Sequence, residues 1–191
     1  MRYPPQHKVE IRQKIVKDAA RRVRAEGLTG AAVSAVMRDT GLTHGGFYKH
    51  FGSKDELLME SVREAFHQIT AYLAHAGEKS ESGTAWKAIV KTYLSQEHCD
   101  HAECGCPFAA LGPELARADN AIKVQLLGEL INYKNRLLPF MPGRRTADKE
   151  RAFFSIFSTM IGAIEIARIL PATAMRERVL ATARDFLCRS F

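Results

Sequence analysis

The chain has 191 residues, of which 46% are hydrophobic and 26% are charged. These proportions are typical of a globular protein and exclude a disordered or fibrous chain. The longest uncharged apolar run near the C-terminus, residues 153–164, is shorter than the roughly 18 apolar residues that a membrane-spanning helix needs. The N-terminus lacks the apolar stretch of a secretory signal, so the expected location is the cytoplasm.

The net charge of +7 is concentrated in the first quarter of the chain. Residues 1–54 contain 11 Lys and Arg against 4 Asp and Glu, whereas residues 55–191 contain 17 of each. A basic segment beside a neutral one indicates a polyanion-binding module attached to a second module. Nucleic acid is the leading candidate for the polyanion. An anionic membrane surface and an ordinary solvated basic face are the alternatives.

The spacing of the hydrophobic residues predicts an all-α protein. No segment alternates strictly between apolar and polar residues, as a half-buried strand would. The pattern of Ser53 followed by Glu56 is typical of a capping box and marks the start of the fourth helix. Gly112 and Pro113 are expected to kink or split the sixth helix. The expected helices cover about residues 8–26, 33–40, 44–50, 54–73, 86–94, 107–115, 121–140, 147–170 and 172–188.

The helix expected at about 147–170 carries apolar residues on nearly every side. Such a helix is either central in its own chain or shared with a second subunit. We favour the shared helix, because Gly162 and Ala163 would let a partner helix approach closely. The last two helices are therefore predicted to form the interface of a homodimer, with Phe154, Ile161, Ile164, Val179 and Phe186 as candidate interface residues.

Residues 33–51, VSAVMRDTGLTHGGFYKHF, have the pattern of a helix-turn-helix. Gly41 suits the tight turn, Leu42 closes it, and Phe47 and Phe51 are four apart and can anchor the second helix. This arrangement leaves a polar outer face whose side chains are suited to phosphates and base edges. An ordinary helical hairpin is the alternative. The outer face and the N-terminal end of the second helix comprise Thr43, His44, Gly45, Tyr48, Lys49 and His50.

The string YKHFGSKDELL, residues 48–58, resembles the TetR/AcrR family of bacterial transcriptional regulators. The resemblance is sharp from about residue 10 to residue 60, and GCPFAAL at 105–111 recurs in one branch of the family. It implies a homodimer of helical subunits that binds a palindromic operator on double-stranded DNA. It also implies a DNA-binding domain at residues 1–52 and an effector-binding and dimerisation domain at 53–191. Effector binding would release the DNA, as in a repressor.

The same resemblance implies DNA-binding roles for individual residues. Thr43 would cap the recognition helix and contact phosphate, and Lys54 would pair with a phosphate at the start of the next helix. His44, Gly45 and Tyr48 would lie in or beside the major groove. Lys49 and His50 would touch phosphate or base edges.

The chain departs from the family pattern in two places. Val36-Met37 and Thr40-Gly41 replace the usual Ile-Ala and Ala-Gly pairs, but they keep the apolar character and the turn glycine. Ala32 stands where the family usually has a Thr at the start of the second helix. The capping and phosphate-contacting role of that Thr is therefore lost, or moved to Thr29 or Ser34.

His98, Cys99, His101, Cys104 and Cys106 fall within nine residues. Such side chains are suited to zinc or copper, but their spacing does not match a known zinc finger. A polar loop of no special function is one alternative. Another is a redox or electrophile sensor, in which a helix N-terminus lowers the pKa of Cys106. We assign no metal and no cofactor, and a metal-responsive regulator remains open.

Several aromatic residues of the C-terminal part could line a pocket for a small-molecule effector, although aromatic residues at helical spacing are more often plain core. With Cys106, the candidate effector or sensor residues are Trp86, Tyr93, Phe108, Phe140 and Phe157; Tyr133 and Phe153 belong to the same aromatic set.

An enzyme is the first rival interpretation. The chain has no GxGxxG, Walker, HExxH or GxSxG motif, and helix capping explains the acidic pair Asp55 and Glu56. The second rival is a module that binds a membrane surface through its basic first helix. That helix lacks the Trp or Phe anchors that this mode prefers, so we expect no membrane partner. No motif in the chain identifies the operator sequence, the effector or the regulated genes.

Overall fold

The computed structural model describes residues 5–81, 83–171 and 173–191, and leaves undescribed the side chains of Pro5, Ala31 and His44. Within this part the chain is helical and contains no strand, as the hydrophobic spacing predicts. The α-helices and short 3-10 helices (η) are, in order, α1 Pro5–Glu26, η1 Leu28–Ala31, α2 Val33–Asp39, η2 His44–Lys49, α3 Lys54–Glu78, α4 Ala85–Tyr93, α5 Gln96–Asp100, η3 Ala102–Cys104, α6 Pro107–Ala116, α7 Asn120–Leu137, η4 Leu138–Phe140, α8 Thr146–Ile169 and α9 Ala174–Ser190.

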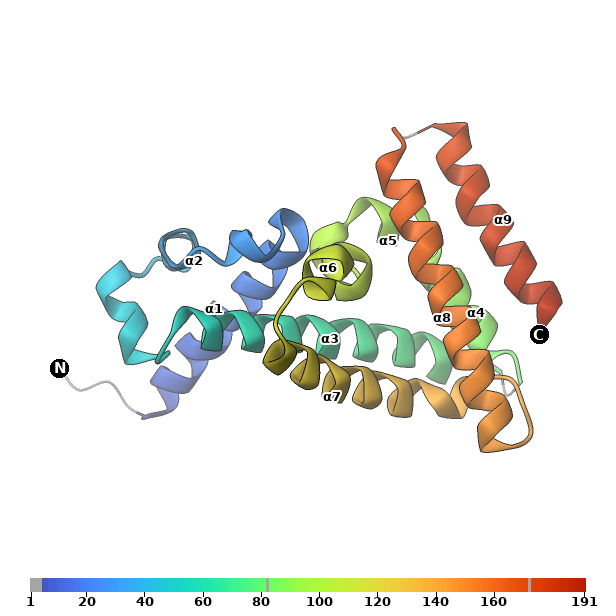
Figure 1. Cartoon of the computed structure of the whole chain (residues 1–191), viewed down its shortest axis with the longest axis horizontal. Helices are drawn as coiled ribbons and strands as arrows, with labels where there is room; N and C mark the ends of the chain where they lie inside the picture. Colours follow the sequence, from blue (N-terminus) through green and yellow to red (C-terminus); the bar gives the residue numbers. More distant parts are fainter. Residues whose placement is uncertain (1–4, 82, 172) are drawn as a thin grey trace.

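Helix α3 connects the two ends of the molecule (Figure 1). At one end it packs on α1, beside α2 and η2, and along its length it packs on α7. At the other end it meets α4, where α8 and α9 lie side by side. A displacement of α3 would therefore act on both ends of the chain.

Three groups of buried side chains hold these helices together. The N-terminal core includes Phe47 and Phe51 and is completed by Leu57 from the first turns of α3. A middle core joins Val23 of α1 to Phe66 of α3 and to residues of α6 and α7. The main core is built from residues of α3 to α9. Because α3 contributes to all three cores, the two ends of the molecule share one continuous interior.

The structure differs from the predicted helices in three places. The segment between α4 and α6, expected as a polar loop, contains α5 and η3. Helix α6 is not split at Gly112 and Pro113, which both lie inside it. The third helix, expected at 44–50, is a 3-10 helix over His44–Lys49, with hydrogen bonds from Gly46 N to Thr43 O and from His50 N to Phe47 O. The consecutive glycines Gly45 and Gly46 destabilise an α-helix, which is consistent with a short 3-10 helix at this place.

The capping box at the start of α3 is only half formed. The Ser53 hydroxyl accepts the Glu56 backbone N–H at 3.0 Å, as expected. The Glu56 carboxylate, however, accepts the N–H of Gly52 at 2.6 Å. The helix start was therefore predicted correctly, although the reciprocal partner is one residue earlier.

The placement of Ile164 at a subunit interface is wrong for this chain, whereas the sharing of α8 with a second subunit stays a prediction. One face of α8, including Phe153, Ile156 and Ile164, is buried in the main core of the same chain. Ile164 has no exposed surface, so it cannot touch a second copy, and Ile161 packs partly against the same core. The opposite face is exposed and includes Phe154, Ile166 and Ile169.

The view that no segment is long enough to span a membrane also needs correction. Helix α8 has 24 residues, and by length and composition it could cross a membrane. The expectation rested only on the uncharged run at 153–164, which is shorter than the whole helix α8. A core helix of a folded domain has the same composition, and the buried face of α8 packs against α4, α6 and α9.

Candidate functional site

The turn between α2 and η2 directs a polar face outward. Gly41 has a φ of +75°, a conformation that side chains rarely adopt. The Leu42 N–H bonds to Met37 O at 2.8 Å, which closes the turn. Phe47 and Phe51 are buried and stacked, with their ring centroids 5.4 Å apart. This pair fixes the orientation of η2 on the N-terminal core.

With Phe47 and Phe51 turned inward, the side chains of Tyr48 and Lys49 face away from the core. Tyr48 is 70% exposed, and Thr43, Gly45 and Lys49 are also exposed. A Cβ at Gly45 would meet no atom of the described structure within 4 Å, so packing inside the chain does not require this glycine. Its small size instead leaves the backbone of η2 open to an approaching surface.

One capping expectation, that of Thr43, is wrong, and of the two alternatives at Ala32 the structure shows the loss of the cap. Thr43 occupies the position before η2, but its side chain makes no capping hydrogen bond in the described structure. Helix α2 follows Ala32, likewise without a side-chain cap among the described residues, so neither Thr29 nor Ser34 has taken over that role. The Thr43 hydroxyl is therefore available to an external group. The His44 side chain lies outside the described residues.

A basic group surrounds the end of η2. Lys49 and Lys54 are exposed, and Lys54 is the first residue of α3. His50 is partly buried, and its Nδ1 atom has no hydrogen-bond partner among the described residues. Burial, together with the charges of Lys8, Arg12 and Lys49, lowers the pKa of His50. Sequence reasoning missed Lys8, because only the packing of α1 brings it to this place.

Arg12 is close to the same group but is engaged in structure. Its guanidinium bonds the carboxylates of Glu56 and Glu60 and the carbonyl of His50, and it lies 4.6 Å from the centre of the Phe51 ring. The hydrogen bonds to Glu60 are the main reason why its pKa is raised. Arg12 thus locks α1 and α3 against the end of η2.

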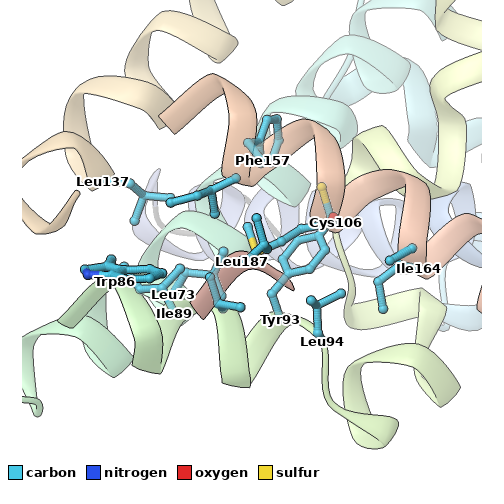
Figure 2. Close-up of a cluster of buried hydrophobic side chains, with 14 of the residues drawn as sticks. Leu73, Trp86, Ile89, Tyr93, Leu94, Cys106, Leu137, Phe157, Ile164 and Leu187 are labelled. Carbon is cyan, nitrogen blue, oxygen red and sulfur yellow. The ribbon is translucent and has the colours of Figure 1, made fainter. Parts of the chain in front are cut away.

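The candidate effector residues do not form one site. Tyr93, Cys106 and Phe157 are buried together in the main core, with Phe108 packed against Phe157. In Figure 2, Trp86 lies at the opposite side of the cluster from Cys106. Trp86 instead lines a surface pocket with Phe140 and Phe191. These residues belong to the main core or pack against it, but the sequence did not show which of them lie together.

Cys106 is not activated as a thiolate in the manner expected. It stands immediately before α6, at the predicted helix N-terminus, but its side chain is fully buried. Burial raises the pKa of the Cys106 thiol, although the Tyr93 hydroxyl, the N–H groups of Ala109 and Phe108, and Arg168 act in the opposite direction. The prediction of a lowered pKa is wrong, because desolvation outweighs the helix N-terminus.

The histidines and cysteines between α4 and α6 are not gathered around one point. His98 Nδ1 donates to Tyr93 O at 2.6 Å, and its Nε2 accepts the Cys106 N–H at 3.1 Å. The Cys99 sulfur accepts two N–H groups of Arg176 at 3.0 and 3.2 Å. Among the described residues, no group of three potential metal ligands is present. The polar atoms of this segment instead attach it to α4, α6 and α9.

Comparison with known proteins agrees with this arrangement. Residues 15–60 match the family model described as bacterial regulatory proteins, tetR family. The N-terminal part of the chain therefore belongs to the TetR family. This match covers the second half of α1, all of α2 and η2, and the start of α3, which together carry the exposed face of η2.

Individual relatives extend the similarity. The chain is 28% identical over 107 residues to the HTH-type transcriptional regulator LmrA of Bacillus subtilis, covering 55% of this chain and 57% of LmrA. It is 30% identical over 105 residues to an uncharacterised HTH-type transcriptional regulator of Mycobacterium tuberculosis, covering 54% and 52% of the two chains. The matched segments thus span about half the length of these curated relatives.

Similarity of fold extends over the whole chain. A TetR-family transcriptional regulator from Cytophaga hutchinsonii superimposes with a TM-score of 0.75 and 19% identity, covering 98% of both chains. The C-terminal helices therefore have the same fold as this regulator. This similarity concerns the fold and does not identify a ligand.

Proposed function

We propose that this TetR-family chain is a DNA-binding transcriptional regulator and not an enzyme. It would bind a palindromic operator as a homodimer and be released by a small effector, as a repressor is. The observation that carries the proposal is the exposed Tyr48 on a short helix that Phe47 and Phe51 fix to the N-terminal core. An aromatic side chain held outward among basic residues suits a DNA groove flanked by phosphates.

The charge distribution supports DNA as the partner. Lys8, Lys49 and Lys54 are exposed around η2, and the first 54 residues carry the whole net positive charge. Phosphate neutralisation by such side chains supplies most non-specific affinity for DNA. A membrane surface is the less favoured partner, because Tyr48 is the one aromatic side chain exposed in α1, α2 and η2 within the described residues. DNA as the partner would place the chain in the cytoplasm.

We assign residues 1–52 to DNA binding and residues 53–191 to effector binding and dimerisation. The boundary falls just before α3 begins at Lys54. Leu57 of α3 lies beyond this boundary but completes the N-terminal core. The boundary therefore separates two functions and not two independent cores.

We assign the dimer interface to the exposed faces of α8 and α9. Ile169 is 82% exposed and Phe186 is 60% exposed, and Phe154 is exposed on the same helix as Ile169. Exposed large apolar side chains of this kind mark interaction surfaces. Val179 packs partly on the main core and would lie at the margin.

The effector would bind in the main core and reach the DNA-binding part through α3 and α6. The burial and raised pKa of Cys106 disfavour an oxidant or electrophile that needs a ready thiolate. The hydrogen bonds of His98 and Cys99 to the protein disfavour a metal effector. A non-covalent organic ligand is the class that remains.

Selection of bound duplexes from a random-sequence DNA pool tests the proposal. We expect the full chain to enrich a two-fold symmetric site with half-sites about one helical turn apart, or a multiple of that distance. Tyr48→Ala should abolish the enrichment. A wild-type chain that enriches no sequence would overturn specific DNA binding.

A further inference from the structure

Arg12 of α1 contacts several parts of the DNA-binding region at once, where α1 crosses the start of α3 (Figure 1). Its Nε atom donates to the carbonyl of His50, the residue that follows η2, at 3.1 Å. Its Nη2 atom donates to Glu56 at 2.9 Å and to Glu60 at 2.5 Å, and its Nη1 atom donates to the second oxygen of Glu60. The guanidinium also lies 4.6 Å from the centre of the Phe51 ring. One side chain therefore joins α1, the end of η2 and the first two turns of α3.

Glu56 extends this connection into the loop between η2 and α3. Its Oε1 atom accepts from Arg12, while its Oε2 atom accepts the backbone N–H of Gly52 at 2.6 Å. The Glu56 backbone N–H in turn donates to the Ser53 hydroxyl at 3.0 Å. The loop that leaves η2 is therefore tied to α1 through the carboxylate that Arg12 holds.

The six residues of η2 cannot fix their own orientation. A helix this short is only marginally stable in isolation, so tertiary contacts decide where it lies. Phe47 and Phe51 bury it against the N-terminal core, but apolar packing is not directional. The hydrogen bonds of Arg12 are directional, and the two-pronged pairing of a guanidinium with a carboxylate adds geometric specificity. Arg12 therefore supplies a restraint on η2 that apolar packing does not.

Arg12 is poorly suited to contact a phosphate. It is one of 11 Lys and Arg residues in the first 54, but its charge is offset by the carboxylates of Glu56 and Glu60. Only 33% of its side chain is exposed. A phosphate would have to displace these carboxylates or approach their negative charge. Any effect of Arg12 on DNA binding should therefore come from where it places η2.

The placement of η2 sets the geometry of the whole DNA-binding face. Tyr48, which we expect at the groove, lies two residues before His50. Lys54, which we expect at a phosphate, lies two residues before Glu56. Because Arg12 bonds to both His50 and Glu56, it sets the position of the groove-facing part relative to the phosphate-facing part. A binding site of this kind must be held to within about 0.5 Å to work.

We propose that Arg12 is a positioning residue for the recognition of a DNA sequence. It holds η2 against the start of α3 in the geometry that base reading needs, and it does not itself contact DNA. This inference rests on the proposed function in taking DNA as the partner. It goes further in assigning sequence specificity to an ion-paired residue of α1.

Two variants that change the charge in opposite directions test the proposal. Arg12→Gln removes a positive charge together with the guanidinium fork. Glu60→Gln removes a negative charge, and its amide offers the guanidinium only one acceptor oxygen. The affinities of the full chain for its selected DNA site and for random DNA are measured by fluorescence anisotropy. Affinity for random DNA depends on charge, so we expect it to fall in Arg12→Gln and to rise in Glu60→Gln.

The ratio of selected to random affinity should behave differently from the random affinity. We expect this ratio to fall in both variants, by about tenfold in Arg12→Gln, which is within the loss that one impaired base contact causes. The double variant should lose no more than Arg12→Gln alone, because both changes break the same link. Lys17→Gln, at an exposed position of α1, is the control and should keep the wild-type ratio. A ratio that stays unchanged in either test variant, or that rises in Glu60→Gln, would overturn the proposal.

Amide hydrogen exchange followed by NMR separates positioning of η2 from stabilisation of the whole fold. The His50 N–H bonds to Phe47 O at 2.9 Å at the end of η2, and the Leu42 N–H bonds to Met37 O at 2.8 Å in the preceding turn. In Arg12→Gln we expect the His50 N–H to exchange faster than in the wild type and the Leu42 N–H to keep its rate, because only the end of η2 opens locally. Equal acceleration at both positions would mean that Arg12 only stabilises the fold, and would overturn the proposal.

The exchange measurement needs no DNA, so it also separates this inference from the proposed function. If the wild type enriches no DNA sequence while Arg12→Gln releases the end of η2, the regulatory function fails and the placement of η2 by Arg12 stands. If the wild type binds its selected site and Arg12→Gln keeps the wild-type ratio, the regulatory function stands and the positioning role fails.

Discussion

The carboxylate of Glu114 accepts the backbone N–H of Leu28, with its two oxygens 3.2 and 3.3 Å from the nitrogen. Glu114 lies in α6, and Leu28 begins η1 in the DNA-binding part. The preceding residue, Gly27, has a φ of +79°, and a Cβ there would lie 2.9 Å from the carboxylate. The other end of α6 is held as well, because Arg24 of α1 donates to Gly105 O at 3.4 Å. Helix α6 thus links the main core to the DNA-binding part.

Replacement of Glu114 should weaken this link. We expect Glu114→Ala to lower the free energy of unfolding by about 1 kcal/mol, since the carboxylate caps an otherwise unpaired N–H much as an N-cap side chain does. Urea denaturation measures the change. Asp185→Ala, at an exposed position of α9, is the control and should have almost no effect. Equal stabilities of the two variants would show that the Glu114 contact contributes nothing.

The proposed interface predicts monomers from single charged substitutions. Ile169→Glu and Phe186→Glu should each produce a folded monomer, because a two-fold contact places the new charge twice in the buried patch. Sedimentation equilibrium with circular dichroism reports mass and folding together. Val124→Glu, on the exposed side of α7, is the control and should remain dimeric. Dimers of unchanged strength in both test variants would place the interface elsewhere.

The buried His98 predicts a loss of stability in acid. Desolvation lowers the pKa of His98 from its usual 6.5 to about 4. The unfolded chain therefore takes up a proton below pH 6.5, whereas the folded chain does not until about pH 4. The free energy of unfolding should fall as the pH falls through this window, by about 3 kcal/mol for a shift of this size.

Variants isolate that contribution from other titrating groups. His98→Gln should flatten the dependence of unfolding free energy on pH between 6.5 and 4, even if it is less stable throughout. His67→Gln, at an exposed position, should retain the wild-type slope. An unchanged slope in His98→Gln would mean that His98 titrates normally in the folded chain.

The cysteines should react with alkylating reagents in the order of their exposure. Cys104 is exposed, whereas Cys99 and Cys106 are buried. Mass spectrometry after brief treatment with iodoacetamide should find Cys104 modified and Cys106 protected until the chain is unfolded in urea. If Cys106 is alkylated as rapidly as Cys104 in the folded chain, Cys106 is accessible and reactive, as the sensor hypothesis requires.

The sequence allowed the DNA-binding part to be predicted because its determinants are local. Gly41, Phe47 and Phe51 lie within eleven residues, and their spacing alone fixes which face of η2 points outward. Lys8 was missed because it joins this group only through the packing of α1 on α3.

The environment of Cys106 shows why the rest of the site was not predictable. Its position before α6 was read correctly, and a helix N-terminus does favour a thiolate. The opposing effect comes from residues distant in sequence, because Tyr93 and the elements of the main core enclose the thiol. Ile164 was misplaced for a similar reason: apolar residues cover most of α8, and only tertiary packing decides which face is internal.

The affinity of the chain for its selected DNA site, measured by fluorescence anisotropy over a range of salt concentrations, tests the central claim most directly. We expect affinity to fall steeply with salt, because counterions are released from the phosphates. Lys54→Ala should weaken selected and random DNA alike and reduce the salt slope by about 1. Tyr48→Ala and His44→Ala should instead weaken the selected site more than random DNA, without unfolding the chain. Affinity that is indifferent to salt, or that is unchanged by Tyr48→Ala, would contradict recognition of DNA by this face of η2.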